Sequence, residues 1–385
     1  MANRIVIAGS LAQKPRHGGH TWVLLQYLLG LQSLGWDVLF LDHIEPKWCL
    51  DGAGRACRPE DSINVRYVMR VMHRFGLTGS YALFLEGNGT VVGPDRREVL
   101  ERAKHAALLL NVMGFLQDES ILAIAPRRVF LDIDPGFGQM WRELGLADVF
   151  VGHDDFVTIG ENIGRPGCPV PTCGLRWLTT RQPVVLSYWP ATELMTGGPY
   201  TSVATWRGAY GPVAYQGKTY GLRVHEFRKF ARLPSLVPDS FQLVLDIDPA
   251  DARDLELLRS KGWSLLEPSL AGDPWAYQRF IAASKGEIMI AKNMYVQTQS
   301  GWFSDRSVCY LASGKPVLAQ DCGFKGLYPT DEGLVSFTTP EQALAGLENI
   351  NCNYTRHARA ARALAEEYFD ARKVLSRLLS QLGVA

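Results

Sequence analysis

The first 41 residues alternate between strand-like and helix-like segments, and this order restricts the fold more than any other feature of the chain. Arg4–Ala8 is a short apolar strand, and residues 9–19 form a polar, glycine-rich loop. Over residues 20–34 apolar side chains recur on one helical face, and Asp37–Leu41 is again strand-like. Such a strand–helix–strand unit predicts a parallel sheet with a ligand site at the carboxyl ends of its strands.

The second half repeats this alternation after a segment of different composition. Residues 160–190 are rich in proline and glycine, so we place the domain junction there. The pentapeptide Leu-Asp-Ile-Asp-Pro at 131–135 and 245–249 ends an apolar run in each half, as expected for two similarly built α/β domains. Further strands are expected at 107–111, 129–132, 149–151, 203–206, 241–245, 264–266 and 286–291, and helices at 248–262 (capped by Asp248), 275–284, 304–314 and 355–382.

Composition excludes several classes of protein. The chain has 385 residues, of which 40 are basic and 39 acidic, so no strong overall field recruits nucleic acid or an anionic membrane. The longest apolar run, 106–116, is about half a membrane span, and the first residues are too briefly apolar for a signal peptide. The seven scattered cysteines contain no Cys-x-x-Cys pair, which argues against zinc and against a disulfide framework. We therefore expect a cytoplasmic protein.

Residues 299–323 carry the most specific pattern. Ser304 is a good N-cap, the short helix after it stops at Gly314, and Pro316 begins an apolar strand. A helix N-terminus has unpaired N–H groups and about half a positive charge, to which Arg306 adds a full charge. Loop and helix together predict a seat for a diphosphate. The residues expected to form it are Ser300, Gly301, Ser304, Asp305 and Arg306.

The run Ala312-Ser-Gly-Lys-Pro-Val317 resembles the donor-binding segment of nucleotide-sugar glycosyltransferases of the GT-B type. Glu332-Gly-Leu334 is similar to the Glu-Gly-Leu loop of the same family, whereas the first half matches only in its general plan. The resemblance implies two Rossmann-like domains facing across a cleft, with the acceptor mainly on the first and the nucleotide sugar mainly on the second. It implies domains at 1–180 and 181–364, with 365–385 returning to the first domain as a helix, and no required metal.

Two positions depart from the family pattern. Many members have a glutamate that hydrogen-bonds the ribose three residues before the Ala of Ala-x-Gly, but this chain has Cys309, and a thiol is a poor acceptor. Asp305 or Glu332 is the expected substitute. The glutamate of many retaining members, seven residues earlier, is Trp302 here, which favours an inverting enzyme. A UDP-sugar is the expected co-substrate, with no other cofactor.

A second constellation lies in the first loop, at His17-Gly18-Gly19-His20. Many inverting members of the family place a histidine base near the start of the first helix, and the histidine pKa lies near the working pH. His20 is the expected base, His17 the weaker alternative, and the three residues 17–19 the acceptor-side loop. Asp134 is the expected orienting acid, with Asp118 and Asp154 as alternatives.

Basic residues near the predicted cleft are expected to oppose the leaving diphosphate, whose charge grows in the transition state. They are Arg207, Lys218, Lys292 and Arg306.

Two short acidic motifs offer a competing, metal-dependent interpretation. Asp132-x-Asp134 and Asp246-x-Asp248 match the Asp-x-Asp pattern that holds a divalent metal in the other main glycosyltransferase fold. Three-residue matches are weak, and both motifs also suit strand ends and helix caps. We expect no metal site.

The sequence thus predicts an inverting, metal-independent glycosyltransferase. The alternatives are a nucleotide-sugar epimerase or phosphorylase of the same fold and a non-catalytic two-domain protein that binds a small ligand. A dinucleotide oxidoreductase ranks lower, because the first loop lacks Gly-x-Gly-x-x-Gly spacing. The acceptor stays open among lipids, natural products, glycans and a modified nucleic-acid base, as does the oligomeric state.

Overall fold

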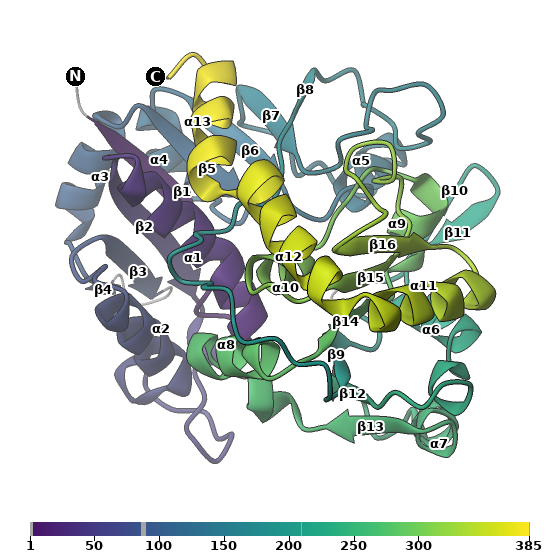
Figure 1. Cartoon of the computed structure of the whole chain (residues 1–385). Helices are drawn as coiled ribbons and strands as arrows, with labels where there is room; N and C mark the ends of the chain where they lie inside the picture. The colour runs from purple at the N-terminus through teal and green to yellow at the C-terminus, as the bar shows by residue number, and fades with distance from the viewer. Residues whose placement is uncertain (1–2, 86–89, 209, 385) are drawn as a thin grey trace.

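The computed structural model describes residues 3–85, 90–208 and 210–384, and it contains two β-sheets flanked by helices (Figure 1). The first sheet has eight strands and the second has six. All strand pairs of the second sheet are parallel, and in the first sheet the β3–β4 pair is antiparallel. The predicted α/β class with two Rossmann-like domains is confirmed.

The first sheet is built around β1, which pairs in parallel with β2 on one side and β5 on the other. Every residue of β5 is buried, as expected for a parallel strand covered on both faces. In spatial order the strands are β4 (Thr90–Val92), β3 (Tyr81–Leu85), β2 (Asp37–Ile44), β1 (Arg4–Ala8), β5 (Leu108–Val112), β6 (Arg128–Asp132), β7 (Asp155–Thr158) and β8 (Trp177–Thr179). The helices between them are α1 (Gly18–Ser33), α2 (Ile63–Arg74), α3 (Arg96–Lys104), α4 (Glu119–Ile124) and α5 (Phe137–Glu143).

The second sheet begins at β9, twenty residues beyond the predicted boundary at 180. The sequence did not predict a hairpin over 213–220 or the two helices α6 (Arg223–Lys229) and α9 (Asn293–Thr298) of this half. Its strands are β13 (Trp263–Leu266), β12 (Phe241–Asp246), β9 (Tyr200–Thr205), β14 (Gly286–Met289), β15 (Val317–Gln320) and β16 (Leu334–Phe337) in spatial order, with the hairpin β10 (Val213–Tyr215) and β11 (Lys218–Tyr220) apart. Its helices are α6 (Arg223–Lys229), α7 (Ala252–Ser260), α8 (Pro274–Ala282), α9 (Asn293–Thr298), α10 (Asp305–Ala312) and α11 (Pro340–Cys352).

Two local predictions were wrong. Residues 149–151 form a turn rather than a strand, because Phe150 is buried against Phe130, with ring centroids 4.9 Å apart. Asp248 does not cap a helix: its carboxylate accepts from Ala250 N at 2.8 Å in a local turn, and α7 begins after Asp251.

The predicted last helix, 355–382, is interrupted where the chain crosses between the domains. α12 (Tyr354–Leu364) leads into a π-helical turn (Ala365–Phe369), and α13 (Ala371–Gln381) follows. At Asp370 the backbone leaves the helix with φ −52° and ψ 121°. Val184 of the linker donates to Phe369 O at 2.7 Å and accepts from Ala371 N at 2.9 Å, so pairing with the linker replaces helical bonds at this point.

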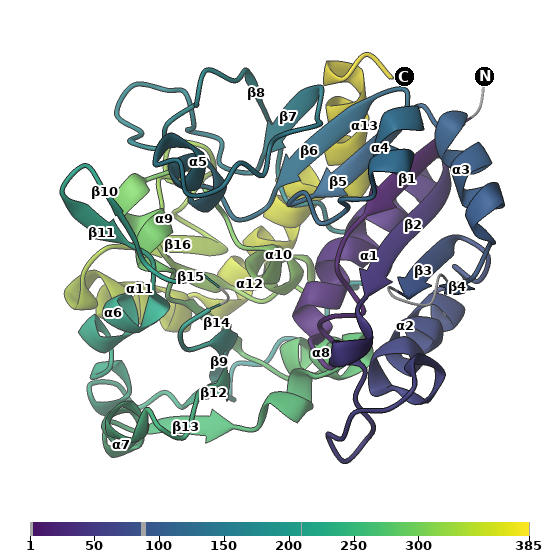
Figure 2. The same cartoon turned by 180° about the vertical axis from the view of Figure 1, so that it is seen from behind.

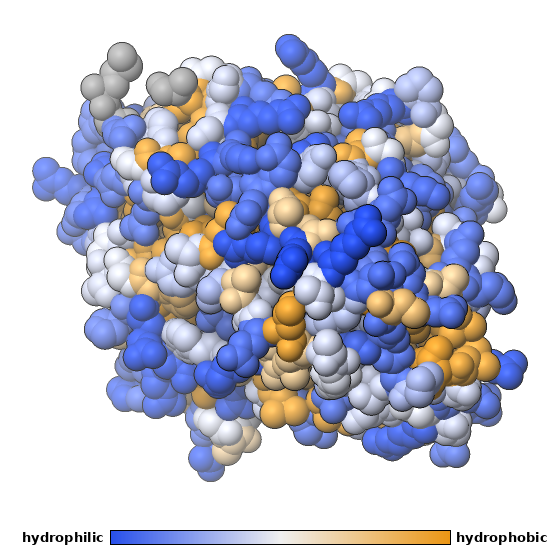
Figure 3. Space-filling model, viewed as in Figure 1, coloured by the Kyte–Doolittle hydropathy of each residue, from blue (hydrophilic) through white to orange (hydrophobic). Residues whose placement is uncertain are grey.

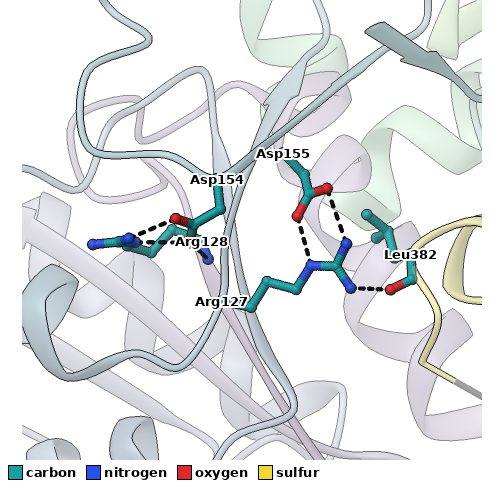
Figure 4. Close-up of polar contacts among 5 residues, drawn as sticks. All are labelled: Arg127, Arg128, Asp154, Asp155 and Leu382. Carbon is teal, nitrogen blue, oxygen red and sulfur yellow. Dashed lines mark hydrogen bonds and ion pairs between the residues drawn. The ribbon is translucent and has the colours of Figure 1, made fainter. Parts of the chain in front are cut away.

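The last helix lies on the first domain, beside α1 (Figure 1). Gly30 of α1 makes this contact close: a Cβ added there would lie 2.5 Å from Leu375 Cδ1 and 3.0 Å from Ala371 Cβ. The end of the chain is tied to the sheet by Arg127, which donates to Leu382 O and pairs with Asp155 (Figure 4). The adjacent Arg128 pairs with Asp154, as the same figure shows.

No helix in the described ranges is long and apolar enough to cross a bilayer. The face drawn in Figure 3 is mainly hydrophilic, with apolar residues in separate groups.

Replacement of Gly30 by Val is expected to lower the free energy of unfolding by about 1–3 kcal/mol, because the new methyl groups overfill the α1–α13 contact. Urea denaturation followed by circular dichroism measures this change. Gly52→Val is the matched control, because a Cβ at Gly52 meets nothing within 4 Å. Equal stability of Gly30→Val and the parent would contradict the close packing of α13.

Candidate functional site

The carboxyl edges of the two sheets face each other, and a bidentate ion pair joins them. Lys292, directly before α9, donates from Nζ to both carboxylate oxygens of Asp134 at 2.8 and 2.9 Å, and Asp134 follows β6 of the first domain. A small cavity nearby is lined from both domains, by Gly19 and Trp22 of α1 and by Asp305 of α10 among others. The predicted site residues therefore meet at the domain interface, with the exceptions given below.

The 299–304 loop, where the diphosphate seat was expected, turns sharply before α10. Gln299 and Gly301 have positive φ of 48° and 78°, and the N-cap Ser304 accepts from Arg306 N at 3.2 Å. Ser300 is fully buried, and its Oγ has no hydrogen-bond partner among the described residues. The loop thus presents the amino end of α10 toward the interface.

Arg306 points away from this seat and into the second domain. Its Nε donates to Glu287 at 2.5 Å and its Nη1 to Val203 O at 2.8 Å. Burial by itself would lower the pKa of Arg306, but Glu287 raises that pKa above its ordinary value. The charge that was expected to face a diphosphate is therefore largely compensated inside the protein.

Arg223, which the sequence analysis missed, is a buried cation that forms no ion pair within the described residues. It is the first residue of α6, only 8% exposed, and its Nε has no partner among the described residues. Burial and the nearby Arg306 lower the pKa of Arg223 to about 10. Asp134, Asp305 and Glu287 oppose this change from a distance, and none of them forms an ion pair with Arg223 within the described residues.

Lys292 makes further contacts besides its ion pair with Asp134. Its ammonium lies 3.2 Å from Tyr295 OH and 5.4 Å from the ring centre of Phe137. Tyr210, from the segment before the β10–β11 hairpin, lies 5.0 Å from Phe137, and the hairpin lies beside α5 (Figure 2). Asp134 is therefore the partner of Lys292 and not, as predicted, of His20.

Two of the predicted donor-binding residues are placed differently. Arg207 lies at the carboxyl edge of the second sheet, but its exposed guanidinium pairs with Asp251, with Nε at 2.9 Å from the carboxylate. Glu332 is on the wrong edge: its neighbour Gly333 accepts from Val317 N at the amino end of β15, and Glu332 itself pairs with Arg356. The expectation that Glu332 binds the donor is wrong, because parallel strands put that loop opposite the site. Lys218 lies on the exposed hairpin.

His20 is half-buried at the start of α1. Its Nε2 is 2.6 Å from Ser10 O, so Nε2 carries the proton and Nδ1 has the free electron pair. Burial, reinforced by the nearby Lys14, lowers the pKa of His20 to about 3, so the ring is neutral at ordinary pH. The pKa of His17 is also lowered by burial, and Asp246 of the second domain opposes that change.

Gly18 and Gly19 are required by the approach of the second domain. A Cβ on Gly18 would lie 2.5 Å from the carbonyl oxygens of Ala271 and Asp273, and one on Gly19 would lie 3.1 Å from Tyr277. The glycine pair of the predicted acceptor-side loop therefore lets α1 pack against the segment that leads into α8.

The carboxylates of the Asp-x-Asp motifs are mostly engaged by protein groups. Asp132 is buried, accepts from Gln139 at 2.7 Å and Thr158 at 2.8 Å, and burial raises its pKa to about 6. In the ranges that the structure describes, no three His, Cys, Asp or Glu side chains gather to hold a metal ion. The alternative orienting acids are also occupied: Asp118 pairs with Arg96 at 2.8 Å and Asp154 with Arg128 at 2.6 Å.

No protein-family model matches the sequence, and no curated protein sequence matches it. Solved structures match the fold over nearly the whole chain. An alpha-glucosyltransferase in complex with UDP and a 13-mer DNA containing an HMU base aligns with a TM-score of 0.59 at 10% identity, covering 99% of both chains. HepE of Anabaena in complex with UDP-glucose gives a TM-score of 0.59 at 12% identity, and sucrose-phosphate synthase from Thermosynechococcus elongatus gives 0.56 at 13%, each covering 99% of both chains. At these identities the likeness shows the fold: the chain has the GT-B fold.

Replacement of Arg223 by Met is expected to leave the melting temperature unchanged or raise it, because the substitution removes a buried charge without an ion pair. The same variant is expected to lose most of the stabilisation that inorganic pyrophosphate gives the parent protein, since Arg223 is a buried cation that forms no ion pair within the described residues. Thermal denaturation with and without pyrophosphate measures both effects.

Arg207→Met is the control for this experiment, since Arg207 is exposed and paired with Asp251. It should keep the full response to pyrophosphate. An unchanged pyrophosphate response in Arg223→Met would remove Arg223 from the anion site.

Proposed function

We propose that the protein is a glycosyltransferase that moves a sugar from a nucleotide diphosphate sugar, with UDP-sugars first, to a hydroxyl of an acceptor. One observation carries this proposal: the buried Arg223, whose Nε has no hydrogen-bond partner among the described residues, lies with the capped α10 between the facing carboxyl edges of a GT-B fold. Structures of that fold that match this chain contain UDP or UDP-glucose. The acceptor would lie on the first domain and the nucleotide sugar on the second.

The leaving diphosphate gains negative charge as the glycosidic bond to the donor breaks. Arg223 and the unpaired N–H groups of α10 supply positive potential at that point, in surroundings from which the two domains exclude water. Lys292 is the next cation, once a phosphate competes with Asp134 for it. These groups support a reaction without a metal, which stays our expectation.

His20 supplies the acceptor side of the reaction. Its neutral ring has an unprotonated Nδ1 that can accept the proton of an acceptor hydroxyl. Because the pKa of His20 is about 3, the proton transfers only as the hydroxyl oxygen bonds to the sugar carbon and becomes acidic. The acceptor is a hydroxyl compound. A modified nucleic-acid base is one class to test, since one structure of this fold was solved with such a DNA.

We expect inversion at the anomeric carbon. Neither family glutamate position holds a carboxylate: Trp302 is stacked on Tyr295 with ring centres 4.1 Å apart, and Cys309 lies buried beside Gln26. NMR of the anomeric proton in the product determines the stereochemistry directly.

Incubation with a panel of UDP-sugars is expected to release UDP slowly without acceptor and faster with a mixture of hydroxyl acceptors, in EDTA as well as in buffer. Binding alone should stabilise the protein by about 2.7 kcal/mol at 100 times the dissociation constant. A nucleotide sugar epimerised at a ring carbon would indicate an epimerase, and binding without turnover would indicate a non-catalytic protein. Loss of turnover in EDTA that manganese restores would establish the metal-dependent alternative.

His20→Ala is expected to lower turnover by about 10²–10⁴, the usual contribution of a general base. Because burial keeps the pKa of His20 at about 3, the base form is complete above that pH, and kcat/KM of the parent should show no loss near pH 6.5 on acidification. Initial rates from pH 5 to 8 test this, with the exposed His105→Ala as control. Near-normal turnover of His20→Ala would make His20 a structural residue.

A further inference from the structure

We propose that Asn162 of the first domain completes the nucleotide seat of the second, so that donor affinity depends on the relative position of the two domains. The inference rests on the proposed function and names a positioning residue for it. Asn162 follows β7 at the carboxyl edge of the first sheet, and it touches the second domain through both its backbone and its side chain.

Three hydrogen bonds carry the argument. Asn162 Nδ2 donates to Gln299 O and to Gly323 O, each at 2.9 Å, and Asn162 N donates to Ser300 O at 2.9 Å. Both side-chain N–H groups of one amide are thereby used on backbone carbonyls of two different loops. Those loops lead into α10 and out of β15. Gly301 N also donates to Cys322 O at 2.8 Å within the second domain, and Asn162 adds bonds to both loops from the first domain.

The loops that it joins have a backbone conformation that requires support. Gln299 has a φ of 48°, which costs free energy for a residue other than glycine and persists only where surrounding contacts impose it. Gly301 and Gly323, with φ of 78° and 90°, lie so near Asn162 that added Cβ atoms would approach it to 3.0 and 2.8 Å. The close packing against Asn162 restricts the conformation of the loop.

Glu161, the residue before Asn162, makes a separate contact with the second domain. Tyr328 OH donates to Glu161, whose carboxylate also accepts from Arg181 Nε at 3.1 Å. Glu161 is 8% exposed and Tyr328 5%, so the contact is largely shielded from water. Separation of the domains would break this contact and the three bonds of Asn162 together.

Donor affinity and domain position are therefore linked. When the domains meet as they do here, the 299–304 loop is held with its Ser300 Oγ unpaired beside the amino end of α10. When they separate, the loop loses all three bonds and relaxes, so that binding of a nucleotide must restore its order. A ligand that binds the ordered loop favours the closed arrangement by the same factor.

The test is Asn162→Asp, which has the same shape but sets carboxylate oxygens against two carbonyl oxygens. Calorimetric titration with UDP is expected to show about 10–30-fold weaker binding, and hydrogen exchange of residues 299–304 should be faster without ligand. With a UDP-sugar, KM should rise by a similar factor while kcat changes less than threefold, because saturating donor orders the loop. Asn162→Ala should also weaken UDP binding and speed the hydrogen exchange of residues 299–304. It replaces Asn162→Asp in the test if the aspartate variant does not fold.

Asn351→Asp is the matched control. Asn351 also makes side-chain hydrogen bonds, to Asp239 and Tyr200, but within the second domain and away from the loop. It should bind UDP as the parent does. Parent-like UDP affinity and exchange in both Asn162 variants would overturn the inference. A parent protein that binds no UDP would instead overturn the proposed function, and exchange at 299–304 would still decide whether Asn162 orders the loop.

Discussion

Burial of α1 on all sides is the constraint on which the rest of the structure depends. Its residues from Thr21 to Leu31 are all buried, because the first sheet covers one side and helices of the second half cover the others. Trp22 donates to Pro274 O at 2.9 Å, and Gln26 accepts from Val185 N at 2.7 Å. One helix thus holds the linker, α8, α10 and α13 together, and its amino end brings His20 to the interface. In this arrangement the helix contacts both domains, and these contacts position the candidate site.

Two buried arginines show how the fold separates structure from chemistry. Arg306 has a carboxylate and a carbonyl within the second domain, so its charge stabilises the sheet–helix contact. Arg223 has no such partner for its Nε, and a buried charge without an ion pair costs stability. This arrangement favours binding of an anion, because the ligand supplies the negative partner that Arg223 Nε lacks in the protein. A residue that lowers stability in this way is expected at a functional position rather than in the rest of the fold.

The interface is also where charges and aromatic rings from distant segments are combined. Lys292 sits between Asp134, Phe137 and Tyr295, which come from different domains or elements. Asn162 reaches the 299–304 loop from the first domain in the same way. The candidate site residues come together where the two domains meet, so substitutions that weaken the interface should also affect the candidate site.

The alternation of strands and helices, the proline-rich junction and the Ser304 cap were determined by the sequence, because periodicity, propensity and capping act over a few residues. The GT-B plan could be predicted from these and from the run that ends in Pro316-Val317. Tertiary structure alone decided which groups these side chains contact. Arg306 pairs with Glu287, and Asp134 pairs with Lys292. Glu332 lies at the opposite edge of the sheet, where it pairs with Arg356. Arg223 and Asn162 gave no local signal, since their roles arise from residues more than 70 positions away. Hydrogen bonds and ion pairs between distant segments depend on how the layers pack, and no short-range pattern in the chain encodes that.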